Sequence, residues 1–261
     1  MTLWRHEWRQ GRISLLVWTA AISFLIGICV LMFPQMQGQM QQAGEMFASM
    51  GSFTEAFGMD EIDFGTLSGF YAVECGNILG LGGAFFAALI ASAALAKEEK
   101  DHTAEFLLTH PISRVRVLTE KWLAVVTQIL VMNLVGYGVA LGSVALIGEP
   151  LPLREITLLH TAYLLMQLEL AGICFGISAF LRRGSVGVGL GMAAVMYFLN
   201  IIANLSDQAE FLKYITPFGY TEGADIVQNM RLDSGRLLLG MGYLAIGLVA
   251  AYICYTRKDI A

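Results

Sequence analysis

Long apolar runs alternate with short polar connections along the whole chain. Each of six runs is long enough to cross a bilayer as an α-helix, at about 1.5 Å per residue. They lie at residues 13–33, 70–96, 122–147, 156–181, 186–205 and 237–255. The pattern predicts an all-α integral membrane protein in which residues 1–261 form a single transmembrane domain.

The segment before the first run, Leu3–Arg12, is amphipathic. Trp4 and Trp8 share one helical face, and three arginines surround it: Arg5, Arg9 and Arg12. Aromatic and basic residues in this pattern are typical of a helix at the membrane interface. We therefore expect an N-terminal interfacial helix followed by a membrane anchor, because the first run is too long for a signal-peptide core.

The connection over residues 34–68 carries five acidic residues and neither Lys nor Arg, which indicates a non-cytoplasmic location. Four apolar residues share one helical stripe there: Met36, Met40, Phe47 and Met50. Thioethers are ligands for copper(I), but no His or Cys joins them. The favoured interpretation is a helix that packs on the membrane or on the protein itself.

The distribution of basic residues predicts the topology. With the N-terminus inside, 12 of the 16 Lys and Arg residues are cytoplasmic, and the exceptions are Arg154, Lys213, Arg231 and Arg236. The positive-inside rule therefore favours a multi-pass topology with both termini in the cytoplasm. We expect the plasma membrane as the location.

The connection over residues 97–121 is the most densely charged part of the chain, and this topology makes it cytoplasmic. Asp101 or Thr103 can cap a short helix that Pro111 ends, and Ser113 can cap a second helix over residues 114–120. The first helix carries the apolar cluster Phe106, Leu107 and Leu108. So short a loop cannot cover this cluster, which favours a partner protein.

The connection over residues 206–236 is non-cytoplasmic in this topology, yet it is rich in aromatic residues around Pro217. It is too short to span and too apolar for a free loop. We expect a re-entrant or interfacial helical hairpin shielded by protein, and the alternative is an ordinary helix in a surface loop.

Composition agrees with a membrane protein. The chain is 56% hydrophobic and 14% charged, with a mean hydropathy of +0.63. In a membrane protein the side on which each charge lies matters more than the net charge of -5, and we expect no nucleic-acid partner. The four cysteines stand singly in apolar runs, which is typical of core residues and not of a metal site or a disulfide framework.

The chain lacks the common catalytic and nucleotide-binding motifs. No lysine follows a glycine, so the phosphate-binding Gly-Lys-Ser/Thr motif is missing, and the four histidines form no metal or triad pattern. We therefore expect a protein that is not an enzyme and that binds neither cofactor nor metal.

Two carboxylates fall within apolar runs. Glu74 lies near the outer end of the second run, with Asn77 one turn further on the same face, and Glu169 lies near the middle of the fourth run. An ionised side chain there is costly. Glu169 is therefore either part of a polar pathway, to which Glu74 and Asn77 would also belong, or a neutral acid bonded to a group such as Asn133 or Gln128.

Glycines recur at small-xxx-small spacing, which favours close helix packing, and a dimer interface is the alternative use. The pairs are Gly76 with Gly80, Gly138 with Gly142, Gly172 with Gly176, and Gly187 with Gly191.

The loop at 97–121 resembles the membrane subunit of exporters of the ABC-2 (type-2 permease) family. The resemblance rests on Glu98-Glu99, Thr103-Ala104-Glu105-Phe106-Leu107-Leu108, Pro111-Ile112-Ser113-Arg114 and Lys121. His102 and Glu120 depart from it, because glycine is common at both positions in the family. The segments Tyr214–Phe218 and Arg257–Ile260 resemble the family's last external segment and its basic end, so the resemblance covers nearly the whole chain.

This resemblance implies that the loop is a coupling helix that docks on a separate cytoplasmic ABC ATPase subunit, which binds ATP and Mg²⁺. It also implies a homodimer or a heterodimer with a related permease in the lipid membrane, and an exported drug, antibiotic, peptide or lipid. Phe106, Leu107 and Leu108 would make the apolar contact, while Glu98, Glu99, Glu105, Arg114 and Arg116 would set its register by charge. The alternatives are a non-transporting sensor or scaffold subunit and a membrane enzyme that uses Glu169.

Overall fold

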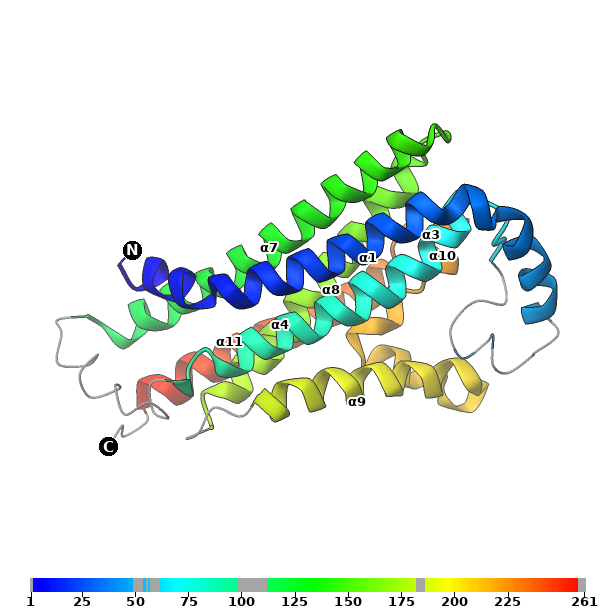
Figure 1. Cartoon of the computed structure of the whole chain (residues 1–261). Helices are drawn as coiled ribbons and strands as arrows, with labels where there is room; N and C mark the ends of the chain where they lie inside the picture. The colour runs from blue at the N-terminus through cyan, green and yellow to red at the C-terminus, as the bar shows by residue number, and fades with distance from the viewer. Residues whose placement is uncertain are drawn as a thin grey trace.

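The computed structural model describes residues 2–48, 54, 56, 62–97, 112–181 and 186–257. This part of the chain is a bundle of long helices without a β-strand (Figure 1). The π-helical turn η1 and the 3₁₀-helices η2 and η3 interrupt or connect the α-helices. The elements are α1 (Thr2–Ala48), α3 (Leu67–Cys75), η1 (Gly76–Leu81), α4 (Gly82–Ala93), α7 (Arg114–Ile147), α8 (Leu153–Ser178), α9 (Val186–Leu205), η2 (Asp207–Tyr214), η3 (Pro217–Tyr220), α10 (Gly223–Asn229) and α11 (Ser234–Arg257).

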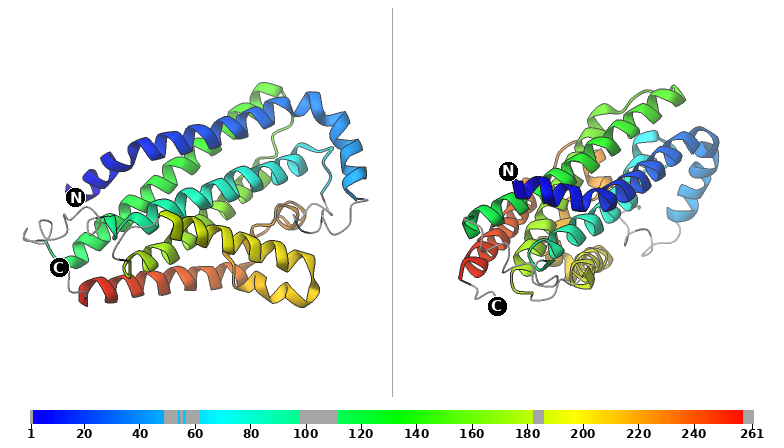
Figure 2. Two further views of the ribbon diagram at one scale, coloured as in Figure 1. Left: turned by 60° about the horizontal axis from the view of Figure 1, so that its bottom comes forward. Right: turned by 60° about the vertical axis from the view of Figure 1, so that its left-hand side comes forward.

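Six segments of the described chain are long and apolar enough to cross a membrane, which confirms the predicted number of spans. Five are single helices, and the second is the series α3, η1 and α4 over Leu67–Ala93. The two ends of the chain lie at the same end of the bundle (Figures 1 and 2). An even number of crossings requires this arrangement.

The first helix differs from its prediction. α1 runs from Thr2 to Ala48 without a break, so Leu3–Arg12 is not a separate interfacial helix. It packs instead along α7, where the Trp4 indole N–H donates to Thr127 Oγ1 at 3.2 Å. Beyond Pro34, which lies inside the helix, α1 bends away from the bundle (Figure 1). Proline removes a backbone N–H and crowds the preceding turn, so it is a common cause of such bends.

α8 is the central helix of the bundle. It packs against α4, α7 and α11, and also against α3, η3 and α10. In its most apolar stretch 67% of the residues are buried, whereas the value for α11 is 11%. α9 and α11 therefore present exposed apolar side chains such as Phe198 and Ile246, as helices that face lipid do.

The second span contains a π-helical turn that α8 and α7 stabilise. In η1 the regular hydrogen-bond ladder is interrupted, and the Leu79 carbonyl accepts from Gln167 Nε2 of α8 at 3.0 Å. Gln167 Oε1 in turn accepts from Asn133 Nδ2 of α7 at 2.7 Å. A Cβ at Gly83 would lie 2.1 Å from Gln167 Nε2, so the glycine makes room for this buried amide.

Glycines bring α8 and α11 into close contact. A Cβ on Gly176 would lie 2.6 Å from the Gly247 carbonyl oxygen, and one on Gly247 would lie 2.4 Å from the Gly172 carbonyl oxygen. The predicted close packing at Gly172 and Gly176 is thus confirmed within one subunit. Gly138 and Gly142 on α7 have nothing within 4 Å of an added Cβ.

The connection between α9 and α11, for which a re-entrant or interfacial helical hairpin was predicted, forms three short helices, η2, η3 and α10. Phe218 and Tyr220 are buried, and η3 packs against α8, α9 and α11. α10 packs on α3 and α8, so the connection folds back onto the bundle (Figure 2). This burial argues against an ordinary surface loop. A re-entrant position in the bilayer stays a prediction.

Candidate functional site

The end of the bundle where α7 begins flanks the predicted coupling loop. α7 starts at Arg114, and its N-cap Ser113 accepts from the Arg116 N–H at 3.3 Å, which confirms the predicted helix start. The helix continues without a break into the third span. The other predicted coupling residues lie outside the described residues: Glu98, Glu99, Thr103, Glu105, Phe106, Leu107, Leu108 and Pro111.

Arg114 is, with Arg116, one of the predicted coupling residues that the structure describes, and it contacts α11. Its Nη1 donates to the carbonyl oxygens of Tyr255 at 3.1 Å and Thr256 at 3.2 Å. These carbonyls belong to the last turn of α11, where a helix has no backbone donors left. A guanidinium also complements the negative end of the helix dipole. Arg114 therefore ties the start of α7 to the end of α11.

Glu120 caps the N-terminus of α1. Its Oε2 accepts from the backbone N–H groups of Leu3 and Trp4, both at 3.0 Å, and its Oε1 pairs with Arg116 Nε at 2.9 Å. Free N–H groups of a first helical turn need such an acceptor, and the carboxylate also suits the positive helix end. Glu120 stands where glycine is common in the family that the loop resembles, and this contact gives the carboxylate a physical role.

Lys121 joins three helices at the same end. Its side chain is completely buried, and Nζ lies 2.8 Å from Glu7 Oε1 of α1. Nζ also donates to the Ala94 carbonyl oxygen, just after α4, at 2.7 Å. Sequence reasoning placed Lys121 among the cytoplasmic basic residues, but its burial makes it a connector inside the bundle. The Glu7 partner was missed, because nothing in the local pattern links residues so distant in sequence.

Glu169 is completely buried on the face of α8 that meets α11. A Cβ on Gly240 of α11 would lie 2.1 Å from Glu169 Oε2, so glycine makes room for the carboxyl group. The Tyr220 hydroxyl lies close by, yet neither group completes a hydrogen bond within the described residues. An ionised carboxylate is costly in such a place. The interpretation of Glu169 as part of a polar pathway stays a prediction.

The partners suggested for Glu169 bond elsewhere. Asn133 donates to Gln167 and to the Ile129 carbonyl, and Gln128 donates to the Ala124 carbonyl of its own helix at 3.3 Å. The expectation of a bond from Asn133 or Gln128 to Glu169 is therefore wrong. Asn133 donates to the side-chain oxygen of Gln167, and the Gln167 nitrogen donates to the Leu79 carbonyl in the π-helical turn.

Glu74 and Asn77 do not form one cluster with Glu169. Glu74 is half-buried near α1, where Cys29 Sγ lies 3.9 Å from its Oε2. Asn77 follows the junction of α3 with η1 and lines a cavity on another side. The three polar groups predicted for one pathway thus have different surroundings.

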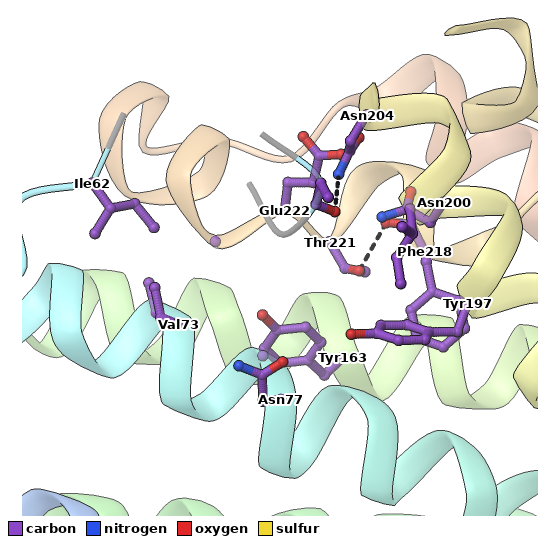
Figure 3. A pocket seen from close by; sticks show the side chains of 15 residues that line it. Ile62, Val73, Asn77, Tyr163, Tyr197, Asn200, Asn204, Phe218, Thr221 and Glu222 are labelled. Carbon is purple, nitrogen blue, oxygen red and sulfur yellow. Dashed lines mark hydrogen bonds between the residues drawn. The ribbon is translucent and has the colours of Figure 1, made fainter. Parts of the chain in front are cut away.

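A polar cavity of about 70 Å³ lies between α3, η1, α8, α9 and the start of α10 (Figure 3). Asn204 Nδ2 donates to the Ala56 carbonyl oxygen at 3.4 Å, which orients its amide. Several polar residues line the cavity, and sequence reasoning had singled out only Asn77 among them. The others include Tyr163, Asn200, Asn204, Thr221 and Glu222. Among the others, Asn200 and Asn204 carried a signal in the sequence, because both are asparagines inside an apolar run.

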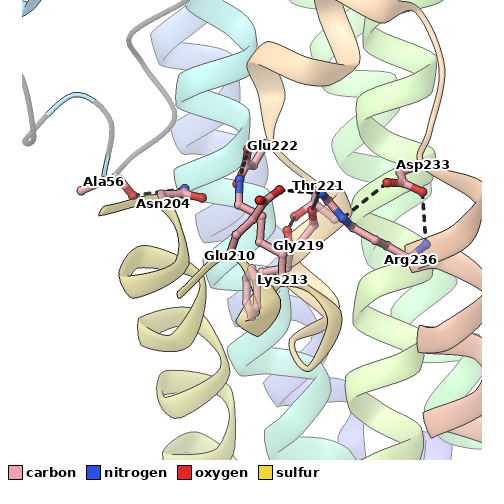
Figure 4. Close-up of polar contacts among 10 residues, drawn as sticks. Ala56, Asn204, Glu210, Lys213, Gly219, Thr221, Glu222, Asp233 and Arg236 are labelled. Carbon is pink, nitrogen blue, oxygen red and sulfur yellow. Dashed lines mark hydrogen bonds and ion pairs between the residues drawn. The ribbon is translucent and has the colours of Figure 1, made fainter. Parts of the chain in front are cut away.

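Ion pairs hold the α9–α11 connection against this cavity (Figure 4). Lys213 Nζ of η2 lies 3.1 Å from Glu222 Oε1. Burial raises the pKa of Glu222, and the neighbouring Lys213 opposes that rise. Arg236 donates to the Gly219 carbonyl oxygen at 2.8 Å and pairs with Asp233 at 3.4 Å. The bond from Arg236 to Gly219 therefore connects the start of α11 to η3.

Comparison with known proteins gives two matches. The model of the family described as "ABC-2 family transporter protein" matches residues 1–260. The uncharacterized protein YhcI of Bacillus subtilis (strain 168) is 24% identical over 216 residues, which cover 73% of this chain and 68% of YhcI.

Proposed function

The chain belongs to the ABC-2 family of transporter proteins, and we propose that it is the permease subunit of an ATP-driven exporter. In this proposal a separate cytoplasmic ATPase, which binds ATP and Mg²⁺, docks on the loop at residues 97–121. The permease works as a dimer in the plasma membrane with both termini in the cytoplasm. Its cargo is hydrophobic or amphipathic.

The observation that carries the coupling proposal is the junction around the start of α7. Arg114 contacts the end of α11, and Glu120 contacts the start of α1. Lys121 contacts both α1 and the end of the second span. A displacement of the loop moves the first turns of α7, which directly continue it. These contacts would pass the displacement to several spans as a rigid-body movement, and not to the second and third spans alone.

An apolar groove supports the choice of cargo. It has a volume of about 370 Å³ and lies between α8, α9 and α11, with Ile173, Met196 and Ile246 among its lining residues. Grooves of this size and character suit the hydrophobic part of a drug, peptide or lipid. They also suit a membrane lipid, so the groove supports the class of cargo and not one compound.

Co-purification from the native membrane tests the proposal. The wild-type protein should bring a cytoplasmic ATPase with it, and Phe106→Asp combined with Leu108→Asp should release that ATPase, because a charge cannot occupy an apolar docking groove. Phe211→Asp is the matched control, since Phe211 is 60% exposed in the α9–α11 connection, on the predicted external side. Retention of the ATPase by the double variant would contradict the assigned docking site.

Turnover distinguishes transport from a sensor or scaffold role. In a reconstituted complex, an exporter should hydrolyse ATP faster when its cargo is present, and cargo should move across the membrane. A sensor subunit would bind the same ATPase without cargo-stimulated turnover. Absence of any ATPase from the native complex would contradict the permease assignment itself.

A further inference from the structure

The polar cavity beside α9 contains buried hydrogen-bond acceptors that lack donors. Asn200 is 9% exposed, and its Oδ1 makes no hydrogen bond within the described residues. Asn204 Oδ1 is buried in the same way, while its Nδ2 is occupied by the Ala56 carbonyl oxygen. Both side chains come from one face of α9 and point toward the cavity (Figure 3). Buried acceptors of this kind are costly unless a ligand or water supplies protons.

A carboxylate adds acceptor capacity on the opposite wall. Glu222 lines the cavity and pairs with Lys213, which lies outside the lining. Lys213 contacts both carboxylate oxygens, at 3.1 and 3.4 Å, and the Asn204 amide also lies beside Glu222. A carboxylate has about four lone-pair sites, so these neighbours do not saturate it. Thr221 donates its hydroxyl proton to the Phe218 carbonyl oxygen at 2.9 Å, which leaves the hydroxyl oxygen as a further acceptor.

Aromatic rings form part of the remaining wall, beside aliphatic residues and glycines. Tyr163, Tyr197 and Phe218 all line the cavity, and the rings of Tyr197 and Phe218 meet edge to face with centroids 5.5 Å apart. An aromatic face attracts a cation, and the attraction grows when the cation is partly removed from water. Acceptor oxygens opposite aromatic rings therefore favour a positively charged donor over an anion.

The charge of the neighbouring chain agrees with a cationic ligand. Ile62 lines the cavity and belongs to the segment 34–68, which contains five acidic residues and neither Lys nor Arg. Asp63, next to Ile62, is exposed. A negative segment next to a site raises the local concentration of cations.

We propose that this cavity binds a primary ammonium group. An ammonium has three N–H donors and no acceptor. The orphaned oxygens of Asn200 and Asn204 and the carboxylate of Glu222 supply three matching acceptors. The group is carried by a soluble amine or by the head of an amine-bearing lipid. The assignment concerns binding by this chain alone and is independent of ATPase coupling.

The test is the thermal unfolding of the full chain in phosphatidylcholine nanodiscs, with n-butylammonium as the probe. We expect a saturable rise of the unfolding temperature. Tetramethylammonium, which has no N–H donor, and sodium chloride should give no such rise at the same ionic strength. An equal rise with tetramethylammonium or Na⁺ would overturn the assignment, as would no rise with n-butylammonium.

Variants separate binding from a structural role. Asn200→Leu should abolish the n-butylammonium response and leave the unliganded unfolding temperature unchanged or higher, because an acceptor without a donor is removed. Asn133→Leu is the control: it should lower the unliganded unfolding temperature by breaking the bond to Gln167, but keep the response. Asn204→Leu provides a second cavity variant if Asn200→Leu does not fold. A response that survives in the cavity variants would overturn the assignment.

The lipid composition distinguishes the two sources of the ammonium group. Phosphatidylethanolamine has a primary ammonium head, and phosphatidylcholine has a quaternary one. If the lipid head occupies the cavity, wild type in phosphatidylethanolamine starts from a higher unfolding temperature and responds less to n-butylammonium, and Asn200→Leu loses that difference. If wild type starts from the same temperature in both lipids and still responds to n-butylammonium, a soluble amine is the ligand.

Discussion

Lys121 of α7 and Glu7 of α1 form an ion pair in which Nζ and Oε1 are 2.8 Å apart, although the lysine side chain has no exposed surface. Removing two charges from water is costly, and only good geometry and further hydrogen bonds offset that cost. The bond from Nζ to the Ala94 carbonyl supplies one of them. The pair therefore defines how α1, α7 and the end of the second span meet.

The first prediction concerns this ion pair. Glu7→Gln should lower the free energy of unfolding by about 3 kcal/mol, because loss of one partner of a buried pair is strongly destabilising. The double variant Glu7→Gln with Lys121→Met should recover most of the loss, since it removes both charges. Equilibrium unfolding in mixed micelles of increasing SDS content measures both effects. Arg9→Gln, an exposed change on the same helix, is the control, and a double variant no more stable than Glu7→Gln would contradict the prediction.

The second prediction concerns Arg114. Arg114→Gln should accelerate amide hydrogen exchange in the last turn of α11 about fivefold, because a charge-assisted bond to terminal carbonyls contributes about 1 kcal/mol. Arg116→Gln should leave α11 unchanged, since Arg116 is 58% exposed and pairs with Glu120. Peptide-resolved exchange by mass spectrometry over residues 250–257 measures this difference. Equal exchange in the two variants would show that Arg114 does not hold the end of α11.

The third prediction concerns the π-helical turn. Gln167→Leu should destabilise the protein by about 1–2 kcal/mol, because the Leu79 carbonyl and the Asn133 amide each lose one hydrogen bond. Gln128→Leu should be nearly neutral, since the Gln128 amide bonds only to its own helix and its Oε1 has no donor within the described residues. Unfolding in SDS mixed micelles compares the two variants. A larger loss of stability for Gln128→Leu than for Gln167→Leu would contradict the prediction.

The fourth prediction compares two glycines. Gly247→Ala should cost about 3 kcal/mol, because its Cβ would lie 2.4 Å from the Gly172 carbonyl oxygen and α8 and α11 would have to separate. Gly138→Ala should instead stabilise α7 by about 0.5–1 kcal/mol, because nothing lies within 4 Å and alanine favours the helix. The same unfolding assay on both variants gives the sign of each change. Destabilisation by Gly138→Ala would show that this face of α7 is covered in the membrane.

The sequence predicted the helices, but it did not predict the contacts that the charged residues make. Arg114 was expected to set the register with an ATPase, and the structure shows it bonded to α11. Lys121 was counted as one of many cytoplasmic charges, and it is a buried connector. The Tyr255 partner of Arg114 and the Glu7 partner of Lys121 lie more than a hundred residues away in the chain. A charge pattern shows on which side of the membrane a residue lies, but not which helix it meets.

The sequence by itself determined the all-helical architecture, the six spans and the start of α7 after Ser113. Each of these follows from local physics: the length of an apolar run must match the bilayer, and a cap acts within one turn. Only the tertiary structure decided that Gln167 stabilises the π-helical turn, that Glu169 faces Gly240, and that a polar cavity lies beside α9. Buried polar groups must find donors and acceptors wherever the fold brings helices together, and helix packing alone chooses those partners.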